Sequence, residues 1–124
     1  MGTGKLTKKR QAIWDKSNGK CWYCGCDLSV SKWQADHVIP ECSIWRDRED
    51  RNYINSIKNM VPACRDCNIG KGPRSIEEFR ARIEETATFF SKKSARLKLG
   101  IRYKQIKIRV YNNPVVFWFE KMGL

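Results

Sequence analysis

The chain has 124 residues, of which 41% are hydrophobic and 11% aromatic, so it can form one compact domain and is neither a disordered tail nor a low-complexity linker. Its net charge of +12 favours a nucleic-acid partner over ordinary solvated surface. It contains no apolar run of the length that a membrane span or a signal peptide requires, so we expect a soluble, intracellular (cytoplasmic) protein without a membrane partner.

The first half of the chain predicts a short helix and a strand. Residues 7–17 read as a basic helix with Thr7 as its N-cap, and Gly19 follows where a helix would stop. The sequence CWYCGCDL then predicts a tight turn, and SKWQADHVIP predicts a strand that Pro40 ends. Residues 41–58 are polar and lack periodicity, which indicates a long loop with one helical turn at most.

The second half predicts a helix and a terminal hairpin. Ser75 and Glu78 form a capping box, and the apolar residues that follow share one helical face typical of core packing: Ile76, Phe79, Ile83, Ala87 and Phe90. Four cations precede Gly100, where a helix dipole favours them: Lys92, Lys93, Arg96 and Lys98. The segment IKIRVYNNPVVFWF alternates and then turns at Asn112-Asn113-Pro114, which predicts a β-hairpin.

Two Cys-x-x-Cys pairs, Cys21 with Cys24 and Cys64 with Cys67, have the spacing with which four thiolates bind one tetrahedral ion. In a reducing compartment such pairs indicate metal rather than disulfides. We expect Zn²⁺ in a closed structural site, with a redox dithiol or unconnected thiols as the alternatives, and we read Cys26 and Cys42 as buried or idle thiols. The zinc would join both ends of a loop that contains the reactive residues.

That loop contains Asp36 followed by His37, the only histidine of the chain. Asn59 lies shortly before the second cysteine pair, and Asn68 lies directly after it. A lone histidine is ordinarily a surface or core residue, but this order of polar residues between two Cys-x-x-Cys pairs is long and specific. In a regular strand Asp36 and His37 would point to opposite faces, so we predict an irregular strand there.

From Cys21 to Lys71 the chain resembles the HNH endonuclease family in its form with a four-cysteine zinc site. The resemblance rests on CWYC, ADHVIP, KNMVPACRDC and NIGKG. It implies that His37 is the general base, that Asp36 and Asn68 bind a catalytic divalent cation, and that Asn59 holds the ββα turn through side-chain hydrogen bonds. The third letter of the motif is Asn in this chain, and the charged run from Glu41 to Lys58 replaces the shorter loop that the family often carries.

The resemblance implies an α+β fold, with a small zinc-stabilised ββα-metal core flanked by helices and the C-terminal β-hairpin. We expect a single HNH nuclease domain over 1–124, with the core at about 21–72, the basic N-terminal helix at 7–17 and an extension at 75–122. An amide oxygen at Asn68 suits Mg²⁺ or Mn²⁺. A neutral imidazole can take a proton from water, and a hard cation can neutralise the charge on the phosphate and the departing oxygen.

The basic residues lie mainly in the two flanks: by count, residues 1–20 carry +5, residues 21–90 carry −1 and residues 91–124 carry +8. This distribution suits DNA bound around a near-neutral reactive centre. Lys71 is a candidate for a phosphate contact, and five arginines are weaker candidates that solvation explains equally well: Arg46, Arg48, Arg51, Arg65 and Arg74.

Two other readings stay open. A non-catalytic zinc-ribbon-like module that binds nucleic acid would explain the cysteines and the charge, but not the ordered polar residues. A degenerate HNH fold that binds without cutting is the second. The sequence does not distinguish a monomer, which would cut one strand at a time, from a homodimer, and it leaves a phage, homing or restriction setting open.

Overall fold

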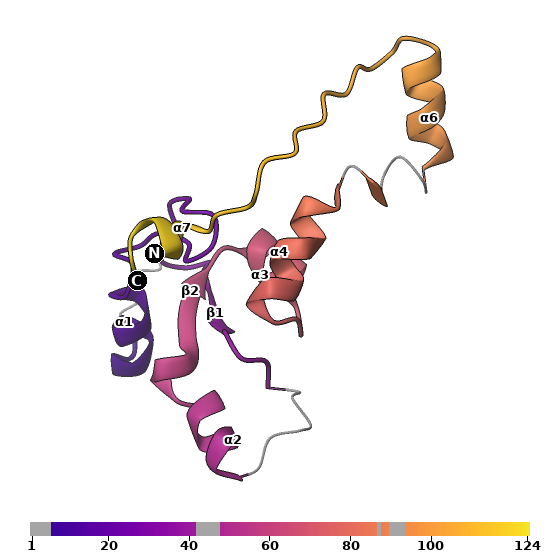
Figure 1. Ribbon diagram of the computed structural model, residues 1–124. Coiled ribbons are helices and arrows are strands. Elements are labelled where there is room, and N and C mark those ends of the chain that lie inside the picture. The colour runs from indigo at the N-terminus through magenta and orange to yellow at the C-terminus, as the bar shows by residue number, and fades with distance from the viewer. Residues whose placement is uncertain (1–5, 42–47, 87, 90–93) are drawn as a thin grey trace.

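The computed structural model describes residues 6–41, 48–86, 88–89 and 94–124. Figure 1 shows an α+β arrangement in which two short strands lie among helices, and α6 and the segment after it extend away from the rest. No helix among the described residues has both the length and the apolar character needed to cross a bilayer. The elements in chain order are α1 (Lys8–Trp14), β1 (Gln34–His37), α2 (Arg48–Ile54), η1 (Ile57–Asn59), β2 (Met60–Ala63), α3 (Arg65–Lys71), α4 (Ile76–Glu84), α6 (Ala95–Arg102) and α7 (Trp118–Lys121).

Helix α1 begins where the sequence predicts it. The Thr7 hydroxyl accepts a hydrogen bond from the backbone N–H of Arg10 at 3.2 Å, which caps the helix, and Ile13 is buried. The helix ends at Trp14, three residues before the predicted end. The chain then turns at Gly19, whose φ of +81° and close approach to the Trp14 ring leave no room for a side chain.

Strands β1 and β2 form an antiparallel pair with Gln34 opposite Ala63 and His37 opposite Met60. The backbone N–H of Val38 donates to the carbonyl of Asn59 at 2.9 Å, so the pairing continues past the last strand residue. Asp36 and His37 themselves keep a regular register, and the irregular backbone that the sequence predicts near Pro40 is found only after the strand, where the chain bends at Val38 and Ile39. Helix α3 follows β2 directly, which completes a ββα unit.

The sheet is packed between two apolar clusters. The larger contains Cys21, Tyr23, Val61, Ala63, Phe79 and Phe117, and the smaller contains Ile13, Trp33 and Met60. All four residues of β2 are buried, because the strand supplies side chains to both clusters. This strand fixes the base of the ββα unit.

The segment predicted as a loop at 41–58 contains more helix than expected. Helix α2 and the short 3-10 turn η1 lead into β2, while Cys42 and Arg46 lie outside the described residues. The Ile54 side chain is buried.

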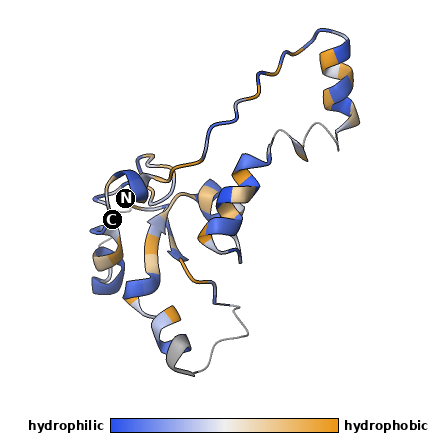
Figure 2. Ribbon diagram, in the orientation of Figure 1, coloured by the Kyte–Doolittle hydropathy of each residue, from blue (hydrophilic) through white to orange (hydrophobic). Residues whose placement is uncertain are grey.

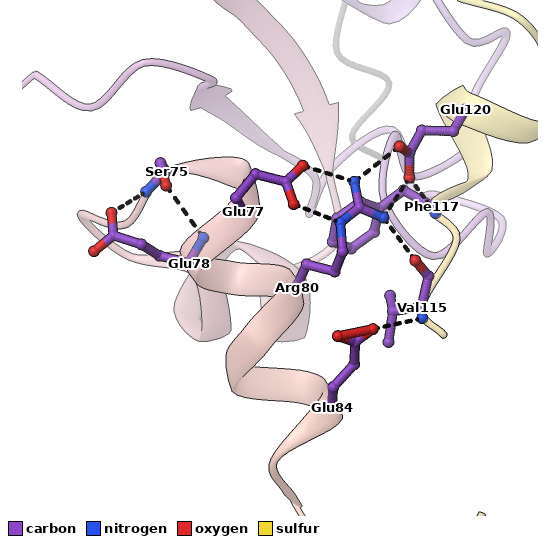
Figure 3. A network of polar contacts seen from close by, with 8 residues as sticks. All are labelled: Ser75, Glu77, Glu78, Arg80, Glu84, Val115, Phe117 and Glu120. Carbon is purple, nitrogen blue, oxygen red and sulfur yellow. Dashed lines mark hydrogen bonds and ion pairs between the residues drawn. The ribbon is translucent and has the colours of Figure 1, made fainter. Parts of the chain in front are cut away.

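Helix α4 starts at the predicted capping box: the Ser75 N–H donates to Glu78 Oε1 at 3.0 Å, and the Glu78 N–H donates to the Ser75 hydroxyl at 3.1 Å (Figure 3). Phe79 is buried, but core packing is wrong for Ile83, which is 38% exposed. Ala87 and Phe90 lie outside the described residues. The helix ends at Glu84.

The predicted C-terminal β-hairpin is wrong. None of residues 103–117 forms a strand, and the expected second strand instead enters helix α7. The reason is a long-range contact: the N–H of Trp118 donates to the carbonyl of Tyr23 at 2.8 Å, and that of Phe119 donates to Trp22 at 3.1 Å. Those donors hold the end of the chain on the first cysteine pair.

Helix α6 and the segment that joins it to α7 form an arm, which precedes the C-terminal contact in the chain. The sequence predicts that a helix ends at Gly100, after a run of cations, but helix α6 continues through Gly100. Figure 2 shows apolar and polar residues alternating along the segment that follows α6. Of the cations named there, Arg96 and Lys98 lie on α6, and Lys92 and Lys93 lie outside the described residues.

Arg80 of α4 joins the C-terminal segment to the body (Figure 3). Its guanidinium makes two hydrogen bonds of 2.8 Å to Glu120 and one of 2.6 Å to the carbonyl of Val115, and it also binds Glu77. The same group lies 4.9 Å from the ring centroid of Phe117. These contacts keep Phe117 in the larger core cluster.

Candidate active site

The four predicted zinc ligands come together. The sulfur atoms of Cys21, Cys24, Cys64 and Cys67 all lie within 4.8 Å of one another. For Zn–S bonds of about 2.3 Å, a tetrahedron has sulfur–sulfur edges of about 3.8 Å, and the sulfurs of Cys24 and Cys64 are 3.8 Å apart. The donor set and its spacing therefore fit one tetrahedral ion.

The surroundings of the sulfurs agree with thiolate ligands. The N–H of Cys64 donates to Cys21 Sγ, and the N–H of Cys67 donates to Cys64 Sγ, each at 3.4 Å. Burial raises the pKa of the Cys64 thiol. The hydrogen bond between the Cys21 and Cys67 side chains raises the pKa of Cys67 and lowers the pKa of Cys21 to about 4. Without a cation, the Cys64 and Cys67 thiols therefore resist ionisation, and a bound metal ion would remove that resistance.

Of the two surplus cysteines, the structure describes only Cys26, which is exposed rather than buried and is not one of the four clustered thiols. Partial desolvation, together with the neighbouring Cys24 thiol, raises the pKa of Cys26 to about 12, so its thiol is protonated at neutral pH. Cys42 lies outside the described residues.

Three of the predicted catalytic residues line one hollow of about 230 Å³ at the end of β1: Asp36, His37 and Asn68. Ala35, Pro40, Glu41, Gly72 and Pro73 complete its wall. Asp36 and His37 come from β1, and Asn68 comes from α3, one residue after Cys67, a predicted zinc ligand. The ββα unit therefore brings together residues that are 32 positions apart in the sequence.

His37 is half-buried, with its side chain 19% exposed. Its Nε2 has no hydrogen-bond partner among the described residues, although Glu41 Oε1 lies 3.0 Å away in a geometry that is not that of a hydrogen bond. In this structure Nε2 is buried and faces the Glu41 carboxylate, so a water molecule reaches it only after the Glu41 side chain moves aside; the neutral imidazole can then accept a proton.

Asp36 is buried, and two donors contact the same oxygen of its carboxylate. The Tyr23 hydroxyl donates to Oδ2 at 2.5 Å, and Lys71 Nζ lies 3.3 Å from Oδ2. Burial raises the pKa of Asp36, while the hydrogen bond from Tyr23 and the charge of Lys71 oppose this shift. Burial and the charge of Asp36 raise the pKa of Tyr23, so its hydroxyl remains a donor.

Asn59 is 2% exposed and acts as a bridge within the loop after β1. Its amide oxygen accepts from the N–H of Ile39 at 2.8 Å, and its amide nitrogen donates to the carbonyls of Ile39 and Ile54 at 3.0 and 2.8 Å. These bonds hold the residues after His37 against the start of β2. Asn59 does not line the hollow, so its contribution is to hold the backbone conformation of the chain after His37.

Asn68 is half-buried on α3, and its side-chain amide makes no hydrogen bond within the described part of the chain. Together with Asp36 it supplies oxygen donors to the hollow. Carboxylate and amide oxygens suit Mg²⁺ or Mn²⁺, so the residues present fit a hard divalent cation.

The residues expected to contact DNA are placed unevenly. Lys71 is fully buried, and its ammonium donates to the carbonyl of His37 at 2.8 Å, which does not fit the expected phosphate contact. Arg65 and Arg51 are exposed, and Arg74 is half-buried with a bond of 3.4 Å to the carbonyl of Lys71. Arg46 and the side chain of Arg48 lie outside what the structure describes.

Sequence reasoning did not single out Tyr23 or Arg80. Tyr23 stands between two predicted zinc ligands in CWYC, and nothing in that spacing indicates a contact with Asp36, 13 residues away. A buried tyrosine usually needs a hydrogen-bond partner for its hydroxyl. That requirement was the one signal in the sequence that could have indicated a polar contact of Tyr23.

The model of the HNH endonuclease family matches residues 21–74, a segment that contains the four clustered cysteines and the three residues of the hollow. Over this segment the chain is similar to HNH endonucleases. Individual relatives are similar to this chain as well. One is YoqL, described as a candidate HNH endonuclease derived from the SPbeta prophage of Bacillus subtilis (strain 168); it is 31% identical over 65 residues, which are 52% of this chain and 28% of that protein.

Two further similar proteins are Cas9 enzymes. The CRISPR-associated endonuclease Cas9 of Corynebacterium diphtheriae is 32% identical over 57 residues, 46% of this chain and 5% of that protein. The crystal structure of the Type II-C Cas9 enzyme from Actinomyces naeslundii aligns with a TM-score of 0.49 and 20% identity, over 65% of this chain and 8% of that one. This chain therefore spans less than a third of the relatives named here.

Proposed function

We propose that this protein is a metal-dependent DNA endonuclease that hydrolyses phosphodiester bonds with His37 as the general base and one divalent cation. The observation that carries the proposal is the hollow at the end of β1, which Asp36, His37 and Asn68 share. The names of the two sequence relatives, both endonucleases, support it.

Each residue of the hollow has a task in this reaction. His37 takes the proton of the attacking water through Nε2, the water oxygen bonds to phosphorus, and the bond from phosphorus to the departing 3′-oxygen breaks. Asp36 and Asn68 would hold Mg²⁺ or Mn²⁺, which when bound neutralises the charge that grows on the phosphate and on the leaving oxygen. Asn59 keeps the backbone after His37 in place.

The four cysteines would bind Zn²⁺ as a closed structural site. With four sulfur ligands the ion has no position for water, so it would stabilise the base of the ββα unit and take no part in cutting. Thiolate ligands and a DNA substrate both favour a reducing, intracellular compartment. The prophage origin in the name of the Bacillus relative supports a phage or mobile-element setting.

DNA would be held partly by the arm. Six exposed cations of α6 and the segment after it make no ion pair within the described ranges: Arg96, Lys98, Arg102, Lys104, Lys107 and Arg109. Cations without an acidic partner are available to phosphates. Arg65 and Arg74, near the hollow, are further candidates.

Incubation of supercoiled plasmid with the zinc-loaded protein tests the proposal. With Mg²⁺ or Mn²⁺ we expect nicked or linear DNA, and with a chelator we expect none. Plasmid that is bound but left intact with both cations would contradict the nuclease and support the non-catalytic zinc-ribbon-like module instead. Sedimentation of the protein with and without DNA would separate a monomer from a homodimer.

A further inference from the structure

The carboxylate of Asp36 is held from one side only. Tyr23 and Lys71 both contact Oδ2, at 2.5 and 3.3 Å, and Oδ1 has no hydrogen-bond or ion-pair partner in the described part of the chain. Asp36 also lines the hollow that Asn68 and His37 share. With Oδ2 occupied, Oδ1 is the oxygen left for a ligand in that hollow.

Tyr23 is itself fixed in place. It is 2% exposed, and its ring packs edge-on against Phe79 and Phe117 with centroids 5.6 Å away in each case. Its carbonyl accepts the N–H of Trp118 at 2.8 Å, and it stands between the zinc ligands Cys21 and Cys24. A hydroxyl on so constrained a ring can reach few positions, so it orients what it binds.

Lys71 completes the frame from α3. Its fully buried ammonium contacts Asp36 Oδ2 and donates to the carbonyl of His37 at 2.8 Å. One cation therefore links the two adjacent β1 residues that the reaction needs, the carboxylate through its side chain and the histidine through its backbone. Neither Tyr23 nor Lys71 lines the hollow.

We propose that Tyr23 is a positioning residue of the nuclease site: from within the zinc knuckle, and together with Lys71, it holds Asp36 so that Oδ1 faces the catalytic cation. The knuckle, defined as residues 21–24 with Cys64 and Cys67, then does more than stabilise the fold, because it sets the orientation of a cation ligand through one hydrogen bond. This inference rests on the proposed function of the hollow.

The substitution Tyr23→Phe tests it, because phenylalanine keeps the buried ring and removes only the hydroxyl. The matched control is Tyr53→Phe on α2, outside the arm and the hollow; Tyr53 is 47% exposed, and its hydroxyl makes no hydrogen bond within the described part of the chain. Zinc content and thermal midpoint are measured first, then Mn²⁺ binding by calorimetry, and then kcat and KM on a DNA duplex.

We expect Tyr23→Phe to bind one zinc as the wild type does, to weaken Mn²⁺ binding about 10- to 100-fold and to lower kcat by a similar factor. KM for DNA should not change, and raising the Mn²⁺ concentration should recover part of the rate. Tyr53→Phe should match the wild type. A merely structural role for Tyr23 would not produce rescue by the cation.

The outcomes separate the two proposals. If the wild type neither binds Mn²⁺ nor cuts, both the function and the inference are overturned. If the wild type binds and cuts and Tyr23→Phe does the same equally well, or if it loses zinc, only the positioning inference is overturned. In the wild type, the hydroxyl proton of Tyr23 should exchange slowly with water and shift in an NMR spectrum when Mg²⁺ is added; a hydroxyl that exchanges freely would also overturn the inference.

Discussion

Lys71 Nζ lies 3.3 Å from Asp36 Oδ2, with the two side chains only 0% and 6% exposed. An ion pair at this depth is costly to break, since either partner left alone is a charge without solvent. Because Asp36 lines the hollow and Lys71 ends α3, the pair also ties the helix of the ββα unit to its first strand.

Replacing Lys71 by Met should destabilise the zinc-loaded protein by about 3–5 kcal/mol, because the carboxylate of Asp36 would keep its charge in a buried place with one donor fewer. Chemical denaturation measures this change. Lys58→Met, at an exposed lysine, should cost less than about 1 kcal/mol. Equal effects of the two substitutions would show that Lys71 is not buried against Asp36 in solution.

Cys24→Ser should lose zinc and the cooperative thermal transition, whereas Cys26→Ser should keep both. The two cysteines are two positions apart and both exposed, but only Cys24 belongs to the clustered sulfurs. Metal analysis and a circular dichroism melt give the answer. If only Cys26→Ser lost zinc, Cys26 rather than Cys24 would be the zinc ligand, and this prediction would be wrong.

Zinc binding should release protons and strengthen as the pH rises from 6 to 8. The pKa values of Cys64 and Cys67 lie above the ordinary thiol value of 9.0, so both are protonated in the metal-free protein and must lose a proton to bind. Cys21, with its pKa lowered to about 4, is already a thiolate over this range.

Calorimetry in two buffers of different ionisation enthalpy counts the released protons. A heat of binding that is the same in both buffers, with affinity independent of pH, would contradict this assignment of protonation states.

Changing Lys98, Lys104 and Lys107 together to Gln should weaken DNA binding and reduce its dependence on salt. Each lost phosphate contact lowers the slope of log K against log salt by about 0.9, so three contacts would lower it by up to about 2.7. Filter binding over a range of salt concentrations measures the slope. The control changes Lys32, Lys58 and Lys121 together to Gln, which removes the same charge outside the arm. An equal effect of the control on the salt dependence would show that the arm has no special role in DNA binding.

Local signals in the sequence predicted much of the site. The helix caps at Thr7 and Ser75–Glu78 depend only on residues within one turn, so the sequence alone predicted them. The cluster of cysteines was predictable as well, because the Cys-x-x-Cys spacing lets two sulfurs reach one ion. The contents of the hollow followed from the resemblance, since no periodicity connects β1 with α3.

Long-range contacts account for what the sequence could not predict. The alternation from Ile106 to Val110 has the pattern of a strand, but no second strand is available because Phe117 packs with Tyr23 and Arg80 holds Val115. In the same way Lys71 reads as a surface cation, and only the packing of α3 on β1 shows that it is buried against Asp36.

The most direct test of the proposed chemistry is the single-turnover rate of DNA cleavage by His37→Ala, measured with Mn²⁺ on protein whose zinc content and Mn²⁺ affinity match the wild type. Removal of the group that takes the proton should lower the rate about 10²- to 10⁴-fold while both metal properties stay unchanged. A rate equal to that of the wild type would mean that His37 is not the base, and the proposed mechanism would then be wrong.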